Sequence, residues 1–373
     1  MEATISTPPV AYHEISPPAL PSNKGKKKLT KLEAIRGFAA AYVVLHHLFS
    51  KKLIIAGKDF SVLFRFGQEA VILFFLLSGF VIQYAYLKSK DKSFKTFFFK
   101  RFNRIYIPLV CVFIANYIVI LISNNNGVSI DWVKLTGNLL MLQDVGSLKP
   151  NVICNPFFGN TPLWSLSYEW WFYMLFFVII NKVKVQSSVF VYGLSIIAAI
   201  TYVIYPNFIN RELMYLCIWW IGADMAGLYV DGKKIDFKSL RIPLSALVLN
   251  IIILIINVKL LHSKSTIGVS PFLEVRHFSF ALISVVGAIL WSKIKWTGFN
   301  KTFGLFEVLA PISFGIYISH WFLVIEAHYF DTLISNVLLR YLCYVMVCVL
   351  FSYLVERVIY VGLNKVILKR AKV

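Results

Sequence analysis

Arg36 and His47 are the first residues of this chain whose types and spacing could support chemistry. They lie eleven residues apart in an apolar run that follows Lys31. On a helix this spacing returns both side chains to one face, about 16 Å apart along the axis. A guanidinium binds phosphate oxygens, and an imidazole takes up protons near neutral pH because its ordinary pKa is about 6.5. Polar residues inside a membrane are costly, so we interpret this pair as functional.

Glu169 and His320 are two further polar residues within apolar stretches, and Arg101 and Arg104 lie in a basic segment between two such stretches. If successive helices alternate in direction, Glu169 and His320 reach a depth similar to that of His47. Acid–base catalysis at that depth would use these three side chains. We place both arginines in an inner loop, where they would join Arg36 in binding an anionic group.

The elements that must position these residues are membrane helices. Hydrophobic residues make up 58% of the 373 residues and charged residues only 15%, well below the quarter that is usual in soluble domains. Apolar stretches of about 17 to 23 residues recur along the chain. The sequence therefore predicts an all-α, polytopic integral membrane protein of about ten helices. They are expected near 32–50, 69–87, 105–123, 164–181, 188–206, 212–230, 242–259, 276–292, 306–326 and 332–356.

The net charge of +20 is a topology signal. With a cytoplasmic N-terminus, 26 of the 38 lysines and arginines fall on inner segments and ten on outer segments. This bias follows the positive-inside rule for an even number of helices. We therefore expect a multi-pass protein of the plasma (inner) membrane with both termini cytoplasmic, embedded in the lipid bilayer, and no nucleic-acid partner.

Three regions follow from the composition. Residues 1–28 are rich in Pro and Lys and predict a disordered basic cytoplasmic arm. Residues 29–362 form the transmembrane domain, and 363–373 a short basic cytoplasmic tail. The five cysteines show no spacing typical of a metal site, so no metal is expected. A nucleophile elbow, a Walker loop and a dinucleotide-binding glycine run are also absent from the sequence.

Six short motifs occur in order between about residues 29 and 357. Together they resemble the motifs of membrane acyltransferase family 3, in which an Arg is followed after ten residues by a His. Here that spacing selects His47 and not His46. The motifs are Leu32–Gly37 with His47, Phe74–Phe80, Arg101–Pro108, Trp164–Glu169, Tyr317–His320 and Glu356–Arg357.

The resemblance implies an O-acetyltransferase. Such proteins move an acyl group, usually acetyl from acetyl-CoA, to a hydroxyl of a surface glycan, its lipid-linked precursor or, in some members, an antibiotic. By this resemblance Arg36, Arg101 and Arg104 would bind the nucleotide phosphates of acetyl-CoA.

The resemblance also gives the acidic and basic side chains their roles. His47 would be the general base, with a covalent acyl-imidazole as the alternative. Glu169 would orient an imidazole or bind a sugar hydroxyl, and His320 is a second catalytic candidate. The chain departs from the family pattern at Ile72, where an Asp is frequent, and at Trp170, where many members have a second acid. A mechanism that needs those acids is not expected here.

Other interpretations stay open at this stage. The same buried residues could form the proton pathway of a transporter or acyl-group channel, or could only lock helices together in a membrane interaction protein. His46, rotated about 100° from His47, favours a packing role. Ser78 and Gly79 indicate close helix packing, and Glu356 with Arg357 suggests an ion pair at the inner face.

Overall fold

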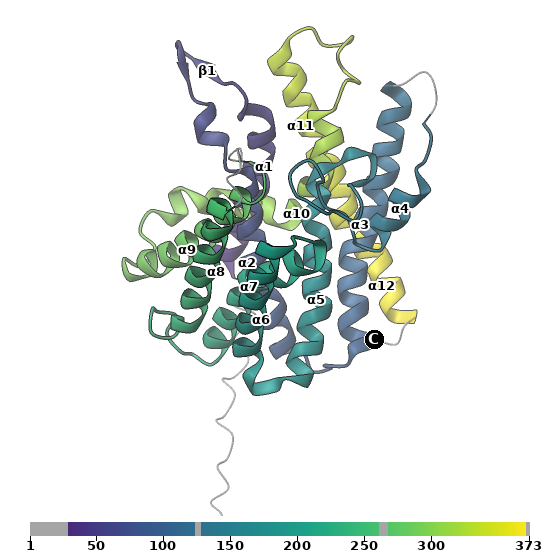
Figure 1. The fold of residues 1–373 in the computed structure, drawn as a ribbon. Coiled ribbons are helices and arrows are strands. Elements are labelled where there is room, and N and C mark those ends of the chain that lie inside the picture. Colours follow the sequence, from purple (N-terminus) through teal and green to yellow (C-terminus); the bar gives the residue numbers. More distant parts are fainter. Residues whose placement is uncertain (1–28, 124–127, 261–267, 371–373) are drawn as a thin grey trace, which may run out of the picture.

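The computed structural model describes residues 29–123, 128–260 and 268–370, so the predicted arm at 1–28 lies outside the described residues. The fold is a bundle of helices with, among the described residues, a single hairpin of two two-residue strands, which confirms the all-α membrane class (Figure 1). In Figure 1 the hairpin projects from the upper end of the bundle. The links between α2 and α3, α5 and α6, and α7 and α8 lie at its lower end.

Two groups of elements follow one another along the chain. The first half contains α1 (Thr30–Phe49), β1 (Ile54–Ile55), β2 (Lys58–Asp59), η1 (Ser61–Phe64), α2 (Gly67–Lys88), α3 (Phe94–Ser123), α4 (Trp132–Leu139), η2 (Phe157–Gly159), η3 (Thr161–Leu163), α5 (Trp164–Lys182), η4 (Lys184–Gln186) and α6 (Ser187–Ile204). The second half contains α7 (Phe208–Val230), α8 (Arg241–Leu260), α9 (Phe272–Lys293), η5 (Phe299–Lys301), η6 (Phe303–Ile312), α10 (Ser313–His320), η7 (Trp321–Ile325), α11 (Val337–Tyr353), η8 (Leu354–Ile359) and α12 (Tyr360–Arg370).

Nine helices of the described residues are long and apolar enough to cross a membrane. The first of the ten predicted helices, α1, is not among them. It has 20 residues but carries Lys31, Glu33 and Arg36 near its start and two histidines near its end. The polar residues that make α1 a functional candidate thus also make it the least membrane-like of the predicted helices.

The basic segment before residue 105 is helical, which corrects the inner loop predicted there. α3 begins at Phe94 and contains both Arg101 and Arg104, with Pro108 inside the helix. Asp91 stabilises its start, because its carboxylate accepts hydrogen bonds from the backbone N–H of Ser93 and the hydroxyl of Thr96. These bonds hold the pKa of Asp91 below its ordinary value. The many basic residues lower the hydropathy of this turn and so hide the helix in the sequence.

The last helix is longer than predicted. α11, the π-helical segment η8 and α12 follow one another without a break to Arg370, so most of the predicted tail at 363–373 continues the helix. The amide of Asn364 on α12 accepts a hydrogen bond of 2.9 Å from Nδ2 of Asn103 on α3. α12 is therefore hydrogen-bonded to the helix that carries the two arginines.

Glycines set the closest helix contacts. A Cβ on Gly79 of α2 would overlap the carbonyl oxygen of Trp219, and one on Gly222 of α7 would overlap that of Leu76. Gly37 of α1 meets the carbonyl of Phe306 in the same way. Small residues let membrane helices approach closely, so the packing interpretation of Gly79 is supported, and α1 is held tightly against η6.

Candidate active site

The structure brings the two histidines predicted as catalytic together. His47, near the end of α1, and His320, the last residue of α10, have ring centroids 5.3 Å apart. The indole of Trp321 approaches His47 edge-on at 5.1 Å. His47 is half-buried, whereas His320 is fully buried. The pair therefore offers one imidazole that a substrate can reach and a second behind it.

The backbone fixes the tautomer of His320. Its Nδ1 lies 2.8 Å from the carbonyl oxygen of Tyr317, and a carbonyl can only accept, so Nδ1 must carry the hydrogen. The other nitrogen, Nε2, is then an acceptor, and it has no hydrogen-bond partner among the described residues. The π-helical turn Trp321–Ile325 follows at once, and such turns occur frequently at functional sites.

The neighbouring histidine, His46, lies in a different environment. Its Nδ1 is hydrogen-bonded to the carbonyl oxygen of Phe64, and its ring packs directly on Gly67 at the start of α2. No hydrogen bond to His47 is found within the described part of the chain. This contrast agrees with the packing interpretation of His46, and the catalytic role of His47 stays a prediction.

Glu169 does not join the histidine pair. Its carboxylate accepts hydrogen bonds from the hydroxyls of Ser78 and Tyr173, and Ser78 in turn accepts one of 3.1 Å from the indole of Trp219. Among the described residues it therefore contacts hydroxyls and not an imidazole, which corrects the expectation that it orients one. The ring of Tyr173 lies 5.8 Å from the guanidinium of Arg101, so Glu169 belongs with the arginine cluster.

Two of the three predicted arginines retain free hydrogen-bonding capacity. Arg36 donates one hydrogen bond of 2.9 Å to the carbonyl of Ala310, and its Nε has no partner within the described residues. Arg101 lies over the rings of Phe97 and Tyr173, and its Nε is likewise unpartnered there. Both side chains can donate hydrogen bonds to further anionic oxygens.

Arg104 is already balanced by a carboxylate. It forms an ion pair with Glu356, whose side chain is only 1% exposed, and its guanidinium lies between the rings of Phe314 and Tyr360. The predicted pair of Glu356 with Arg357 is wrong, because Arg357 is exposed on η8 while Glu356 points to α3. The ion pair of Arg104 therefore joins η8 to α3.

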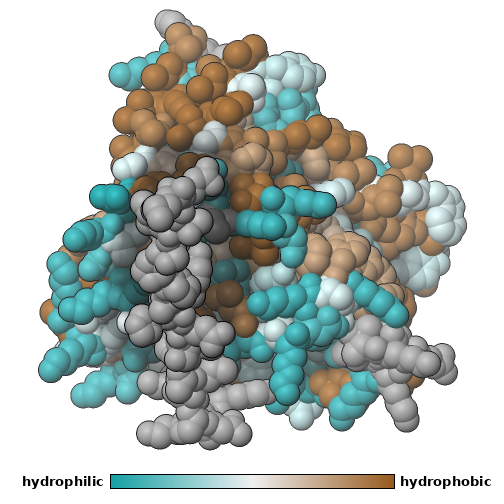
Figure 2. All heavy atoms as spheres, turned by 90° about the horizontal axis from the view of Figure 1, so that it is seen from below, coloured by the Kyte–Doolittle hydropathy of each residue, from teal (hydrophilic) through white to brown (hydrophobic). Residues whose placement is uncertain are grey.

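Hydrophilic side chains gather at the lower end of the bundle (Figure 2). They include the exposed Lys182, Lys184, Lys233, Lys234 and Lys238 on the links between α5 and α6 and between α7 and α8. This basic surface would raise the local concentration of an anionic ligand. Arg36 and Arg101, whose Nε atoms are unpartnered among the described residues, therefore belong to a molecule with a basic lower end that attracts anions.

Comparison with known proteins decides the family. A family model described as an acyltransferase domain matches residues 29–357. The chain belongs to acyltransferase family 3. The family predicted from the six motifs is thereby confirmed.

A curated relative supports the same assignment. The acyltransferase MdmB of Streptomyces mycarofaciens is 33% identical to this family 3 chain over 168 residues. The match covers 43% of this chain and 42% of the relative, so the chain spans less than half of the length of the curated protein it matches. No solved structure matches the chain.

This family 3 chain also has a buried charged cluster that the sequence analysis missed. Asp144 and Lys149, in the loop before α5, form an ion pair of 2.9 Å, and Arg211 of α7 lies 3.4 Å from the same carboxylate. Tyr168 donates a hydrogen bond of 2.6 Å to Asp144, and the ammonium of Lys149 sits 3.8 Å from the ring centroid of Trp164. Burial lowers the pKa of Lys149, and the charge of Asp144 opposes this change.

Only half of this cluster can be recognised in the sequence, namely its charged residues at the ends of helices. Charged residues stand next to apolar stretches at Arg211, Glu212 and Glu274, as they do at Arg36. Their partners come from a loop that appears polar and surface-exposed by composition. Sequence alone therefore does not show that the loop folds into the bundle.

Proposed function

We propose that this chain is a membrane O-acyltransferase that moves an acetyl group from acetyl-CoA to a hydroxyl of a surface glycan or of its lipid-linked precursor. Family membership supports acyl transfer. The observation that carries the proposal is the histidine pair, with one half-buried imidazole beside a second whose acceptor nitrogen is unpartnered. The donor, the acceptor and the orientation in the membrane are parts of the proposal.

The donor would bind from the lower end, which we place in the cytoplasm because most lysines and arginines flank that side. Arg36 and Arg101 would bind its phosphates, since guanidinium groups match phosphate oxygens in geometry and charge. The pantetheine arm would then lie along α1, and the about 16 Å between Arg36 and His47 on a helix would place the thioester near the imidazole.

His47 would act as the general base. It takes the proton of the acceptor hydroxyl while the hydroxyl oxygen attacks the thioester carbonyl, and the carbon–sulfur bond breaks to release CoA thiolate. The free Nε2 of His320 offers an acceptor for the imidazolium that forms on His47. The proton then passes to the thiolate, so the products are the acetyl ester and CoA. In the alternative, His47 itself is acetylated before the acceptor enters.

The test uses the purified full chain in nanodiscs, with radiolabelled acetyl-CoA and a panel of candidate glycans. We expect label in the glycan with the wild type and its loss with His47→Ala. Full acetylation by a correctly inserted His47→Ala variant would refute the mechanism. Label that crosses the membrane of a proteoliposome without reaching any acceptor would favour the transporter alternative. Surface-glycan NMR of cells with and without the gene would then identify the acceptor.

A further inference from the structure

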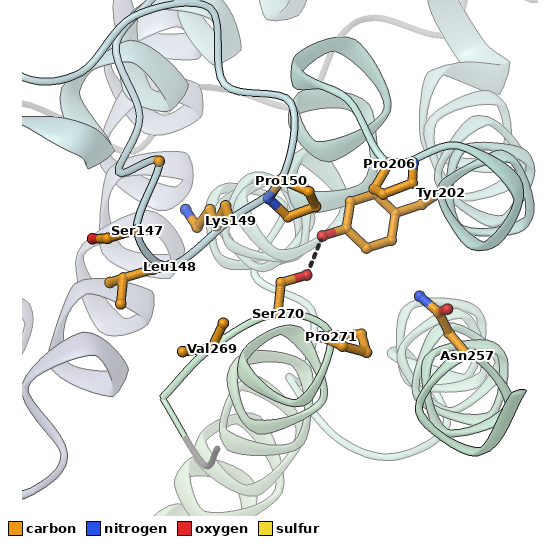
Figure 3. A pocket seen from close by; sticks show the side chains of 11 residues that line it. Ser147, Leu148, Lys149, Pro150, Tyr202, Pro206, Asn257, Val269, Ser270 and Pro271 are labelled. Carbon is orange, nitrogen blue, oxygen red and sulfur yellow. Dashed lines mark hydrogen bonds between the residues drawn. The ribbon is translucent and has the colours of Figure 1, made fainter. Parts of the chain in front are cut away.

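A hollow whose lining includes Lys149 of the buried charged cluster opens between the loop before α5 and the segment before α9 (Figure 3), and neither His47 nor His320 lines it. Its walls are the loop 146–150, the end of α6, the end of α8 and the segment 269–271 before α9. Its volume is about 440 Å³, within the range of about 300–1,000 Å³ that is typical of small-molecule pockets. Two hydrogen bonds hold the walls in place. Arg211 donates one to the carbonyl of Pro150, and the backbone N–H of Ser270 donates the other to the carbonyl of Leu148.

Apart from Lys149, whose ammonium is bound to Asp144, the polar side chains that line this pocket are uncharged. Tyr202 and Ser270 are hydrogen-bonded through their hydroxyls at 2.7 Å, and Tyr202 also donates to Glu274 at 2.8 Å. Asn257 is only 2% exposed, and its Oδ1 has no hydrogen-bond partner among the residues that the structure describes. Figure 3 shows its amide directed from α8 toward Tyr202. A buried amide oxygen without a partner is costly, so a ligand donor here would be favoured.

The cations beneath the pocket are already paired. The ammonium of Lys149 is bound to Asp144 and Tyr168, so it is not available to a ligand. Arg211 lies 3.4 Å from the same carboxylate and donates a hydrogen bond to the carbonyl of Pro150. An anionic ligand would therefore meet no unpaired cation on the wall of the pocket. The rings of Pro150 and Pro206 add an apolar wall that suits the C–H face of a sugar ring.

We propose that this pocket is a subsite that binds a neutral sugar residue of the acceptor, at a distance from the sugar that is acetylated. The proposal rests on the proposed function. Side chains connect the two places: Lys149 lies on Trp164, the next residue Ser165 is hydrogen-bonded to Tyr317 at 2.8 Å, and Tyr317 holds His320. Neither His47 nor His320 lines the pocket, so a sugar bound there would contribute to the affinity for an extended acceptor and not present the reacting hydroxyl.

The test measures binding and turnover separately. Saturation-transfer NMR with the nanodisc protein would use methyl α-glucopyranoside as a neutral probe and glucuronate as an anionic probe. We expect the neutral probe to bind in preference, and Asn257→Ala to weaken it by about three- to tenfold, the effect of one lost hydrogen bond. With an oligosaccharide acceptor, the same variant should raise the acceptor KM while kcat and the acetyl-CoA KM stay unchanged.

Asn250 provides a matched control on α8, two turns before Asn257. It is similarly buried, and its Oδ1 is likewise without a partner among the described residues, but its Nδ2 donates to Ser195 within the bundle and the residue lies outside the pocket. Asn250→Ala should leave probe binding unchanged, and Ser270→Ala is a second pocket variant should Asn257→Ala fold poorly.

The outcomes separate this proposal from the proposed function. The subsite is refuted if neither probe binds, if glucuronate binds better, or if both pocket variants bind as the wild type does. A wild type that binds the neutral sugar but transfers no acetyl group from acetyl-CoA supports the subsite and overturns the proposed function.

Discussion

The two adjacent histidines of α1 should respond to substitution in opposite ways. His47→Gln removes the expected base, and general-base catalysis contributes about 10²- to 10⁴-fold to a rate. No hydrogen bond of His47 is lost within the described residues, so the free energy of unfolding should change little. His46→Gln breaks the hydrogen bond to Phe64 that joins α1 to the segment before α2, which costs about 1 kcal/mol.

The assay pairs initial rates of acetyl transfer with thermal unfolding of the same purified samples. We expect His47→Gln to lose turnover and keep its melting temperature. His46→Gln should keep turnover within about tenfold, which corresponds to 1.4 kcal/mol, and melt earlier. A His46 variant that is inactive but stable, beside an active His47 variant, would show that the spacing argument chose the wrong imidazole. His320→Phe should lower kcat more than His46→Gln, because it removes the acceptor nitrogen beside His47.

Three further predictions concern packing, charge and pH. Gly79→Val should destabilise the protein by at least about 1–3 kcal/mol in thermal unfolding, because its side chain would overlap the carbonyl of Trp219; an unchanged melting temperature would contradict the close contact. Arg104→Met should cost about 3–5 kcal/mol by leaving Glu356 buried without its cation, and the double variant with Glu356→Met should recover most of this loss; equal melting of single and double variants would contradict it. The hydrogen bonds to Asp91 place its pKa below the ordinary 3.8, so its stabilising contribution is present above that value and is lost as the pH falls through the lowered pKa. Unfolding of Asp91→Asn measured against pH should lack this acid loss, and an identical profile to the wild type would refute the assignment.

The helices could be predicted from the sequence because hydropathy reports burial in lipid residue by residue. The choice of His47 over His46 rests on the Arg-to-His spacing of the family motif, which on a helix also places His47 on the face of Arg36, and its catalytic role stays a prediction. Reliance on hydropathy also explains the error at Arg101. The basic residues of this motif lower the local hydropathy and therefore predict a loop, although the backbone is helical from Phe94.

Contacts between distant segments could not be predicted in this way. Depth along a helix fixes the height of Glu169 but not the neighbour that it faces, and the structure turns it toward Ser78 and Tyr173. The cluster around Asp144 is built from a loop, α5, α7 and α9, and no single one of these segments contains its pattern. Residues that act together across four segments become visible only in three dimensions.

The order of synthesis gives the buried cluster a consequence of its own. Asp144 and Lys149 precede Arg211 by about sixty residues and Glu274 by more than a hundred. Until α7 and α9 are inserted, the loop has neither the guanidinium that binds Pro150 nor the wall that bears Ser270. Its polar atoms must stay hydrated during that interval. The segment 128–160 can therefore pack into the bundle only after α7 and α9 have been inserted. In a nascent chain halted after α6, this segment would be accessible to proteases although the helices up to α6 are already in the membrane.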